Sequence, residues 1–106
     1  MPEDLTDVIF RADRAGPHKG SITAIFPAYP GTNQYDALCY AHVGQHSSCS
    51  YEWYRYNTRP ATAAEYADLK RELESLSPEP YRLRVVKRWT REHAEARRAA
   101  CRRSVA

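Results

Sequence analysis

The sequence predicts an α+β domain with a mainly antiparallel sheet of four to five strands. Three observations lead to this prediction. Four short segments rich in β-branched and aromatic residues come first, an amphipathic helical pattern follows, and one more alternating segment precedes a second helical pattern. The predicted order is strand, strand, strand, strand, helix, strand, helix, with one helix packed on the sheet and a basic helix at the C-terminus.

The composition narrows the class of protein. The length of 106 residues fits a single domain, covering 1–106 with 91–106 as a basic helical tail. Charged residues make up 27% and hydrophobic residues 42%, which is typical of a globular chain rather than a disordered one. The chain has neither a membrane-spanning apolar run nor a signal-peptide pattern, so we expect a cytoplasmic protein that does not enter a membrane.

The predicted strands are short and separated by turn residues. They cover residues 7–11, 21–26, 36–43 and 51–56. A Gly- and Pro-containing turn at 15–20 joins the first two, and loops are expected at 27–36 and 44–50. In the third strand, Leu38, Tyr40 and His42 share one face, whereas Cys39, Ala41 and Val43 share the other. In the fourth strand, Glu52, Tyr54 and Tyr56 are expected to be exposed.

The second half begins with a helix signal. Thr62 and Glu65 have the spacing of a capping box. An apolar stripe follows at helical spacing, formed by Tyr66, Leu69, Leu73 and Leu76. Residues 77–80 end the helix, and 81–89 then alternate as a strand with Tyr81, Leu83 and Val85 inward. Thr90 can cap the last helix, over about 91–103, which carries little apolar surface and is expected to be frayed or held by a partner.

Charge is distributed unevenly along the chain. Residues 81–106 carry nine basic and two acidic residues, whereas 1–80 carry seven basic and eleven acidic ones. A basic end favours an anionic partner, which is nucleic acid, a nucleotide or an acidic protein surface. Basic residues also suit the C-terminus of a helix without any partner. The candidate anion-binding residues are Arg82, Arg84, Lys87, Arg88, Arg97, Arg98, Arg102 and Arg103.

Several segments carry a resemblance to a known group of proteins. They are VIFR at 8–11, AIFP at 24–27, YAHVGQH at 40–46, PATAAEY at 60–66 and RVVKR at 84–88. Together they resemble short uncharacterised proteins encoded by bacteriophages and bacterial mobile elements, over roughly positions 7–91. The resemblance implies a bacterial host cell and a recurring role for His42, Gln45 and His46, and it carries no activity.

A mixed cysteine and histidine pattern lies at residues 39–49. Cys39, His42, His46 and Cys49 are all residue types that ligate zinc. Cys39 and His42 would, however, point to opposite faces of a strand, so we expect no metal site and no cofactor. The three cysteines are expected to be reduced thiols.

Two functional hypotheses remain from the sequence. The first is a non-enzymatic binding module in which the basic end holds the anion and His42, Gln45 and His46 line a small pocket, while Tyr54 and Tyr56 are candidate ligand-binding aromatics on the exposed face of the sheet. The second is a small His-dependent hydrolase or metal-binding protein centred on His42 and His46. The absence of nucleophile-elbow and phosphate-loop motifs favours the first, and the sequence leaves open whether the protein forms a homodimer.

Overall fold

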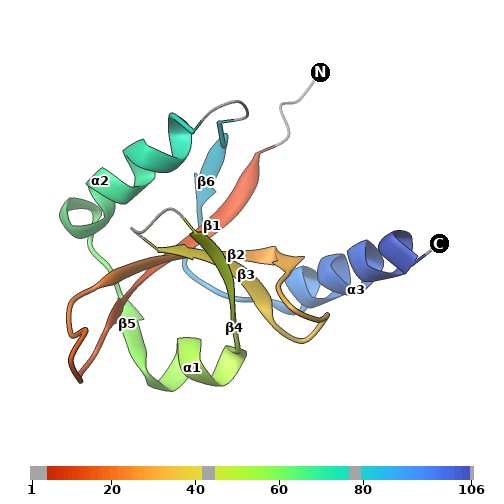
Figure 1. Cartoon of the computed structure of the whole chain (residues 1–106), viewed down its shortest axis with the longest axis horizontal. Helices are drawn as coiled ribbons and strands as arrows, with labels where there is room; N and C mark the ends of the chain where they lie inside the picture. Colours follow the sequence, from red (N-terminus) through yellow and green to blue (C-terminus); the bar gives the residue numbers. More distant parts are fainter. Residues whose placement is uncertain (1–4, 42–44, 77–79, 106) are drawn as a thin grey trace.

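The computed structural model describes residues 5–41, 45–76 and 80–105, without the side chains of Gln45 and of 103–105 (Figure 1). Its elements follow in chain order. They are β1 (Thr6–Asp13), β2 (Ile22–Pro30), β3 (Ala37–Ala41), β4 (Gln45–Cys49), α1 (Tyr51–Tyr56), β5 (Thr58–Pro60), α2 (Ala63–Glu74), β6 (Leu83–Val85) and α3 (Arg91–Val105). Figure 1 shows α2 on one side of the sheet, α1 on the other, and α3 extending away from the sheet.

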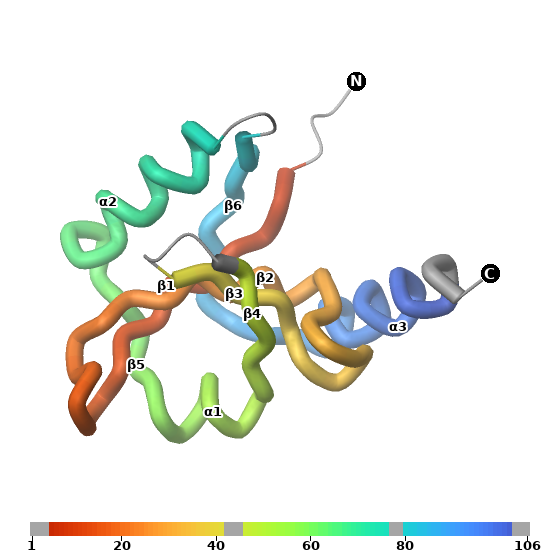
Figure 2. Tube along the Cα trace, in the orientation of Figure 1, coloured from red at the N-terminus to blue at the C-terminus, as the bar shows by residue number. Residues whose placement is uncertain are grey.

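The sheet is mainly antiparallel, which confirms the predicted α+β class. Its strand order is β4-β3-β2-β1-β5, and β6 pairs with β1 as the one parallel pair among the described strands. Figure 2 shows β6 running beside the start of β1, although the two strands lie at opposite ends of the sequence. β1 therefore pairs with three different strands and is the centre of the fold.

Alternating side chains divide the core into two layers. The α2-side core contains Val8, Phe10, Ala24, Phe26, Tyr40, Leu69 and Leu73. The α1-side core contains Ile9, Ile25, Ala37, Cys39, Cys49 and Tyr54. This confirms the predicted separation of Val8 and Phe10 from Ile9, and of Tyr40 from Cys39. Each fully buried large side chain, such as Phe26, contributes about 2 kcal/mol through removal of apolar surface from water.

The helix predicted from Thr62 is confirmed. The Thr62 hydroxyl accepts a hydrogen bond from the backbone N–H of Glu65 (3.2 Å), and the Glu65 carboxylate accepts one from the backbone N–H of Thr62 (2.9 Å). These two bonds satisfy N–H groups that the first turn leaves without helical partners. Leu69 and Leu73 then bury the apolar stripe of α2 against the sheet.

Several local predictions are wrong. The loop expected from residue 27 begins only after Pro30, because β2 runs over Ile22–Pro30. Residues 51–56 form helix α1 rather than a strand, with the Ser50 hydroxyl accepting a hydrogen bond from the backbone N–H of Trp53. The segment expected to be a polar loop contains β4, an edge strand paired only with β3 among the described residues. Val85 is 39% exposed rather than inward-facing, whereas Leu83 packs against the α2-side core and Val86 against the α1-side core.

Candidate anion-binding surface

The predicted ligand-binding residues do not converge on one pocket in the described part of the chain. His46, on β4, pairs with Tyr40 of β3, and both lie on the α2 side of the sheet. The Nε2 atom of His46 is 2.9 Å from the hydroxyl of Tyr81. The His46 ring packs edge-on to Tyr40 at a centroid distance of 4.9 Å. Tyr54, in contrast, belongs to the α1-side core. The two residues are therefore separated by the sheet.

The exposure predicted for Tyr54 is wrong. Only 8% of Tyr54 is exposed, because α1 turns its ring onto the buried guanidinium of Arg11, 4.5 Å from the ring centroid. Tyr56 is 66% exposed, as expected, at the end of α1. His42 and the side chain of Gln45 lie outside the described residues, so the recurring role predicted for them stays a prediction.

The cysteines and histidines form no three-ligand metal cluster within the described residues. Cys39 and Cys49 are both buried free thiols in the α1-side core, and Cys39 Sγ lies 3.1 Å from Ser47 Oγ. A hydrogen bond with Cys49 lowers the pKa of Cys39, against the effect of burial, and the same bond raises the pKa of Cys49. The sequence favoured a buried Cys39, which is confirmed, but it did not predict that Cys49 is buried beside it in the same layer.

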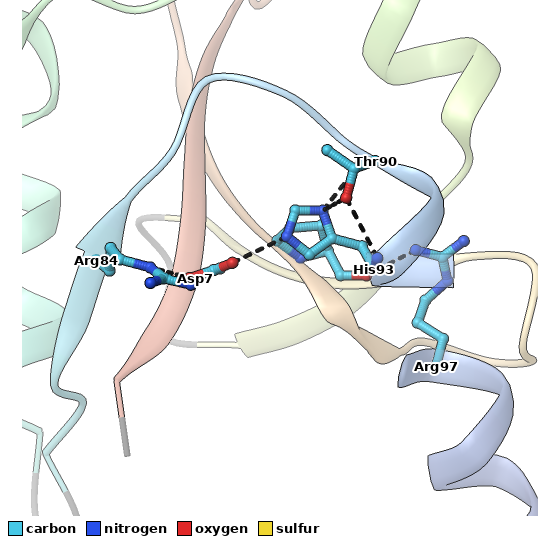
Figure 3. Close-up of polar contacts among 6 residues, drawn as sticks. Asp7, Arg84, Thr90, His93 and Arg97 are labelled. Atoms are coloured by element: carbon cyan, nitrogen blue, oxygen red, sulfur yellow. Dashed lines mark hydrogen bonds and ion pairs between the residues drawn. The ribbon is translucent and has the colours of Figure 1, made fainter. Parts of the chain in front are cut away.

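A partly buried polar network fixes the start of α3 to the sheet (Figure 3). The Asp7 carboxylate accepts a hydrogen bond from Arg84 Nε (2.7 Å) and lies 2.9 Å from His93 Nε2. His93 Nδ1 accepts the backbone N–H of Thr90 (3.0 Å), which leaves the proton on Nε2, pointing at Asp7. The network thereby joins β1, β6 and α3.

The network resembles a catalytic array but has a structural role. Thr90 Oγ1 lies 3.1 Å from His93 Nδ1, which gives a series of hydroxyl, imidazole and carboxylate. That nitrogen already accepts the Thr90 backbone N–H, and Thr90 Oγ1 accepts the backbone N–H of His93 (3.3 Å). This reciprocal pattern is that of a capping box with histidine in place of glutamate.

The Asp7 carboxylate gives stability to this network in a pH-dependent way. Burial opposes its charge, but the hydrogen bonds from Arg84 and His93 outweigh burial and hold the pKa of Asp7 below its usual 3.8. A lowered pKa in the folded state stabilises the protein above pH 3.8, and this contribution disappears as the pH falls through the folded-state value.

Asp7→Asn is therefore expected to reduce the pH dependence of unfolding. The variant should be about 1–3 kcal/mol less stable near pH 7, because Arg84 and His93 lose a charged acceptor. Its free energy of unfolding, measured in urea, should then fall less than that of the wild type below pH 3.8. Asp68→Asn, which removes an exposed carboxylate, is the control. Equal acid sensitivity of Asp7→Asn and the wild type would contradict the assignment.

A second contact holds the body of α3. Arg97, predicted to bind an anion, is only 4% exposed. Its Nη1 donates to the carbonyl of Pro27 (2.6 Å) and its Nε to the carbonyl of Gln34 (3.0 Å), while its guanidinium lies 4.8 Å from the Trp89 ring centroid. Burial lowers the pKa of Arg97, and the charge of Asp36 opposes this shift. Its donors are therefore committed to the fold.

These contacts explain how a helix with little apolar surface is retained. The prediction that α3 frays or requires a partner was based on its apolar surface alone. His93 and Arg97 are one helical turn apart, and they attach this face of α3 through polar contacts to β1, the end of β2 and the segment after it. The opposite face of α3 is left to solvent.

Most of the remaining cations from residue 59 onward fall into two groups. Arg59, Lys70, Arg71 and Arg84 are each paired with a carboxylate. Five others are exposed and form no ion pair with any residue that the structure describes. They are Lys87, Arg88, Arg91, Arg98 and Arg102. Arg82 belongs to neither group, since it has contacts within the molecule, and the side chain of Arg103 is not among those that the structure describes.

Sequence reasoning did not place Arg91 among the candidate residues. Arg91, Arg98 and Arg102 are separated by seven and four residues, so they share one face of α3, opposite His93 and Arg97. This helical spacing was available in the sequence and could have identified the face. Glu95 lies on the same face, so the net charge there is positive but not uniformly so.

None of the described helices is long and apolar enough to cross a membrane. Comparisons with protein-family models, with curated proteins and with solved structures gave no match.

Proposed function

We propose that this protein is a non-enzymatic binding module that holds nucleic acid along the exposed face of α3. The observation that carries the proposal is the row of Arg91, Arg98 and Arg102, exposed and without intramolecular ion pairs among the described residues. The Asp7–His93 and Arg97 contacts support it, because they hold this face in place before any partner binds.

The spacing of the charges favours a linear polyanion. At about 1.5 Å of rise per residue, the three arginines lie at intervals of roughly 10 Å and 6 Å along the helix axis. A single nucleotide is too short to meet all three, whereas a nucleic-acid backbone presents phosphates over that whole distance. An acidic protein surface can also do so, and it is the alternative that the experiment addresses.

The triple variant Arg91→Gln, Arg98→Gln, Arg102→Gln is expected to bind a labelled 20-nucleotide single-stranded DNA at least about tenfold more weakly, measured by fluorescence anisotropy. The slope of log affinity against log salt concentration should fall by about 2 units, since about 0.7 counterions are released per neutralised phosphate. Glu95→Gln should strengthen binding, because it removes a carboxylate from this face.

Two controls make the result specific. Arg59→Gln, Lys70→Gln, Arg71→Gln removes the same charge from cations that are already paired, and it should retain most of the affinity. Polyglutamate of similar length tests the acidic-protein alternative. Equal losses in the two triple variants would overturn the role of the α3 face, and tighter binding of polyglutamate than of DNA would overturn nucleic acid as the partner.

A further inference from the structure

The two strands that share one edge of β1 leave a gap between them. The carbonyl of Val8 accepts the backbone N–H of Val86 (2.9 Å), and the carbonyl of Phe10 accepts that of Ala61 (3.1 Å). Alternate residues of a strand direct their backbone groups to the same edge, so β6 and β5 both approach β1 from this side. β6 runs parallel to β1 and β5 runs antiparallel to it, and the two strands end before they reach each other along this edge of β1.

A cleft of about 380 Å³ lies at this gap. Ile9 and Phe10 of β1 line it, together with Pro60 and Tyr66 on one side and Val85 and Val86 on the other. Phe10 and Tyr66 are stacked at a centroid distance of 4.3 Å and form an aromatic wall of the cleft. The volume falls within the range of roughly 300–1,000 Å³ that small-molecule sites occupy.

All charged residues that line this cleft among the described positions are cations. Lys87 is exposed and is not paired with any described carboxylate. Arg11 is 9% exposed, and its hydrogen bonds go to neutral groups, namely the Thr58 side chain and the carbonyls of Tyr54 and Thr58. The apolar walls therefore lie in a positive local field that no described carboxylate of the lining offsets.

We propose that this cleft binds a small apolar monocarboxylate, with its hydrocarbon part against Phe10, Tyr66 and Val85 and its carboxylate at Lys87. Apolar walls favour the hydrocarbon part through burial of its surface, and the cationic lining selects a negative over a neutral or positive head group. This site is separate from the α3 face, and it does not depend on nucleic-acid binding.

The test uses octanoate as the probe, with 1-octanol and octylammonium as matched ligands that change only the head group. Titration of the ¹⁵N-labelled protein should give saturable amide shifts at Ile9, Phe10, Val86 and Lys87 with octanoate. 1-Octanol should bind more weakly and octylammonium weakest of the three. Shifts that do not saturate, or that map elsewhere, would overturn the proposal.

Variants locate the head group and the apolar part. Lys87→Gln is expected to weaken octanoate binding roughly two- to fivefold, which is the range for an exposed ion pair. Arg88→Gln, which removes the neighbouring exposed cation outside the cleft, should leave it unchanged. Val85→Asp should abolish binding, and its 39% exposure makes the substitution compatible with folding. Equal effects of Lys87→Gln and Arg88→Gln would show that net charge alone attracts the probe, against the assigned site.

Two further outcomes distinguish octanoate binding in the cleft from binding at α3 and from self-association. The α3 triple variant should keep octanoate binding while losing DNA binding, so failure of one proposal leaves the other intact. If the same four amides shift when the unliganded protein is diluted, a second copy of the chain covers the cleft, and the monocarboxylate proposal is wrong.

Discussion

Arg97→Met is expected to destabilise the protein by about 3 kcal/mol. The substitution keeps a long side chain but removes both donors, which leaves the carbonyls of Pro27 and Gln34 without the charged partner they have now. It also removes the cation above the Trp89 ring. The free energy of unfolding in urea, followed by tryptophan fluorescence, measures the effect.

The neighbouring residue provides the matched control. Arg98 is exposed, so Arg98→Met should change stability by no more than about 0.5 kcal/mol. Arg97→Lys keeps the charge but cannot donate in the two directions that the guanidinium does, so it should recover only part of the loss. A free energy of unfolding for Arg97→Met equal to that of Arg98→Met would show that α3 is not held through this residue.

Gly31→Ala should also be strongly destabilising, by about 2–3 kcal/mol, because the turn between β2 and β3 packs directly against β4. A Cβ at this position would lie 2.8 Å from Ser48 Cβ and 2.9 Å from the carbonyl oxygen of Ala37. The first contact can relax only by moving β4, and the second only by moving the backbone of β3. The shift of the urea midpoint measures the effect.

A substitution at a second glycine, Gly16, measures the cost of backbone conformation without the cost of steric crowding. Gly16 has a φ of +90° and open space around it, so Gly16→Ala carries only a conformational penalty of about 1 kcal/mol. Adding Ser48→Gly to Gly31→Ala should recover part of the lost stability, since it removes the clash with the Ser48 side chain and leaves the one with the Ala37 carbonyl. A smaller effect for Gly31→Ala than for Gly16→Ala would contradict the close packing of this turn.

The elements that the sequence predicts correctly have strong local signals. Thr62 and Glu65 mark the start of α2 because their hydrogen bonds are local and do not depend on the rest of the fold. Successive side chains of a strand point to opposite faces, so the sequence assigns Val8 and Phe10 to one face of β1 and Ile9 to the other. Both faces are covered by core, which is why all three residues are apolar. In these segments, local preference and tertiary packing agree.

The elements that the sequence misses have signals of another kind. Tyr51, Trp53 and Tyr54 have high strand propensity, but their segment is short and Ser50 caps it as a helix. β4 is a polar edge strand whose pairing with β3 is a backbone property, so it has no apolar alternation to detect. Whether such a segment forms a helix or a strand depends on the elements that it contacts in the folded protein.

The candidate site was only partly accessible from the sequence for a similar reason. The basic character of the C-terminal segment was evident, but composition does not distinguish Arg97, which is buried against carbonyls, from Arg98, which is exposed. The network of Asp7 and His93 joins residues 86 positions apart, and no local pattern can predict it. Only the helical spacing of Arg91, Arg98 and Arg102 could have separated the exposed cations of α3 from those used by the fold.

The central position of β1 has a consequence for biosynthesis. Thr6 pairs with Leu83 and Asp7 reaches His93, so the first strand acquires its last partners only after these distant residues have been made. While the segment that carries them is still inside the ribosome, the nascent polypeptide has an incomplete strand edge that can associate with other chains. Folding of this domain is therefore expected to finish only once that segment has emerged from the ribosome. The Asp7–His93 contact, which orders the start of α3, is then also the contact that completes folding of the domain.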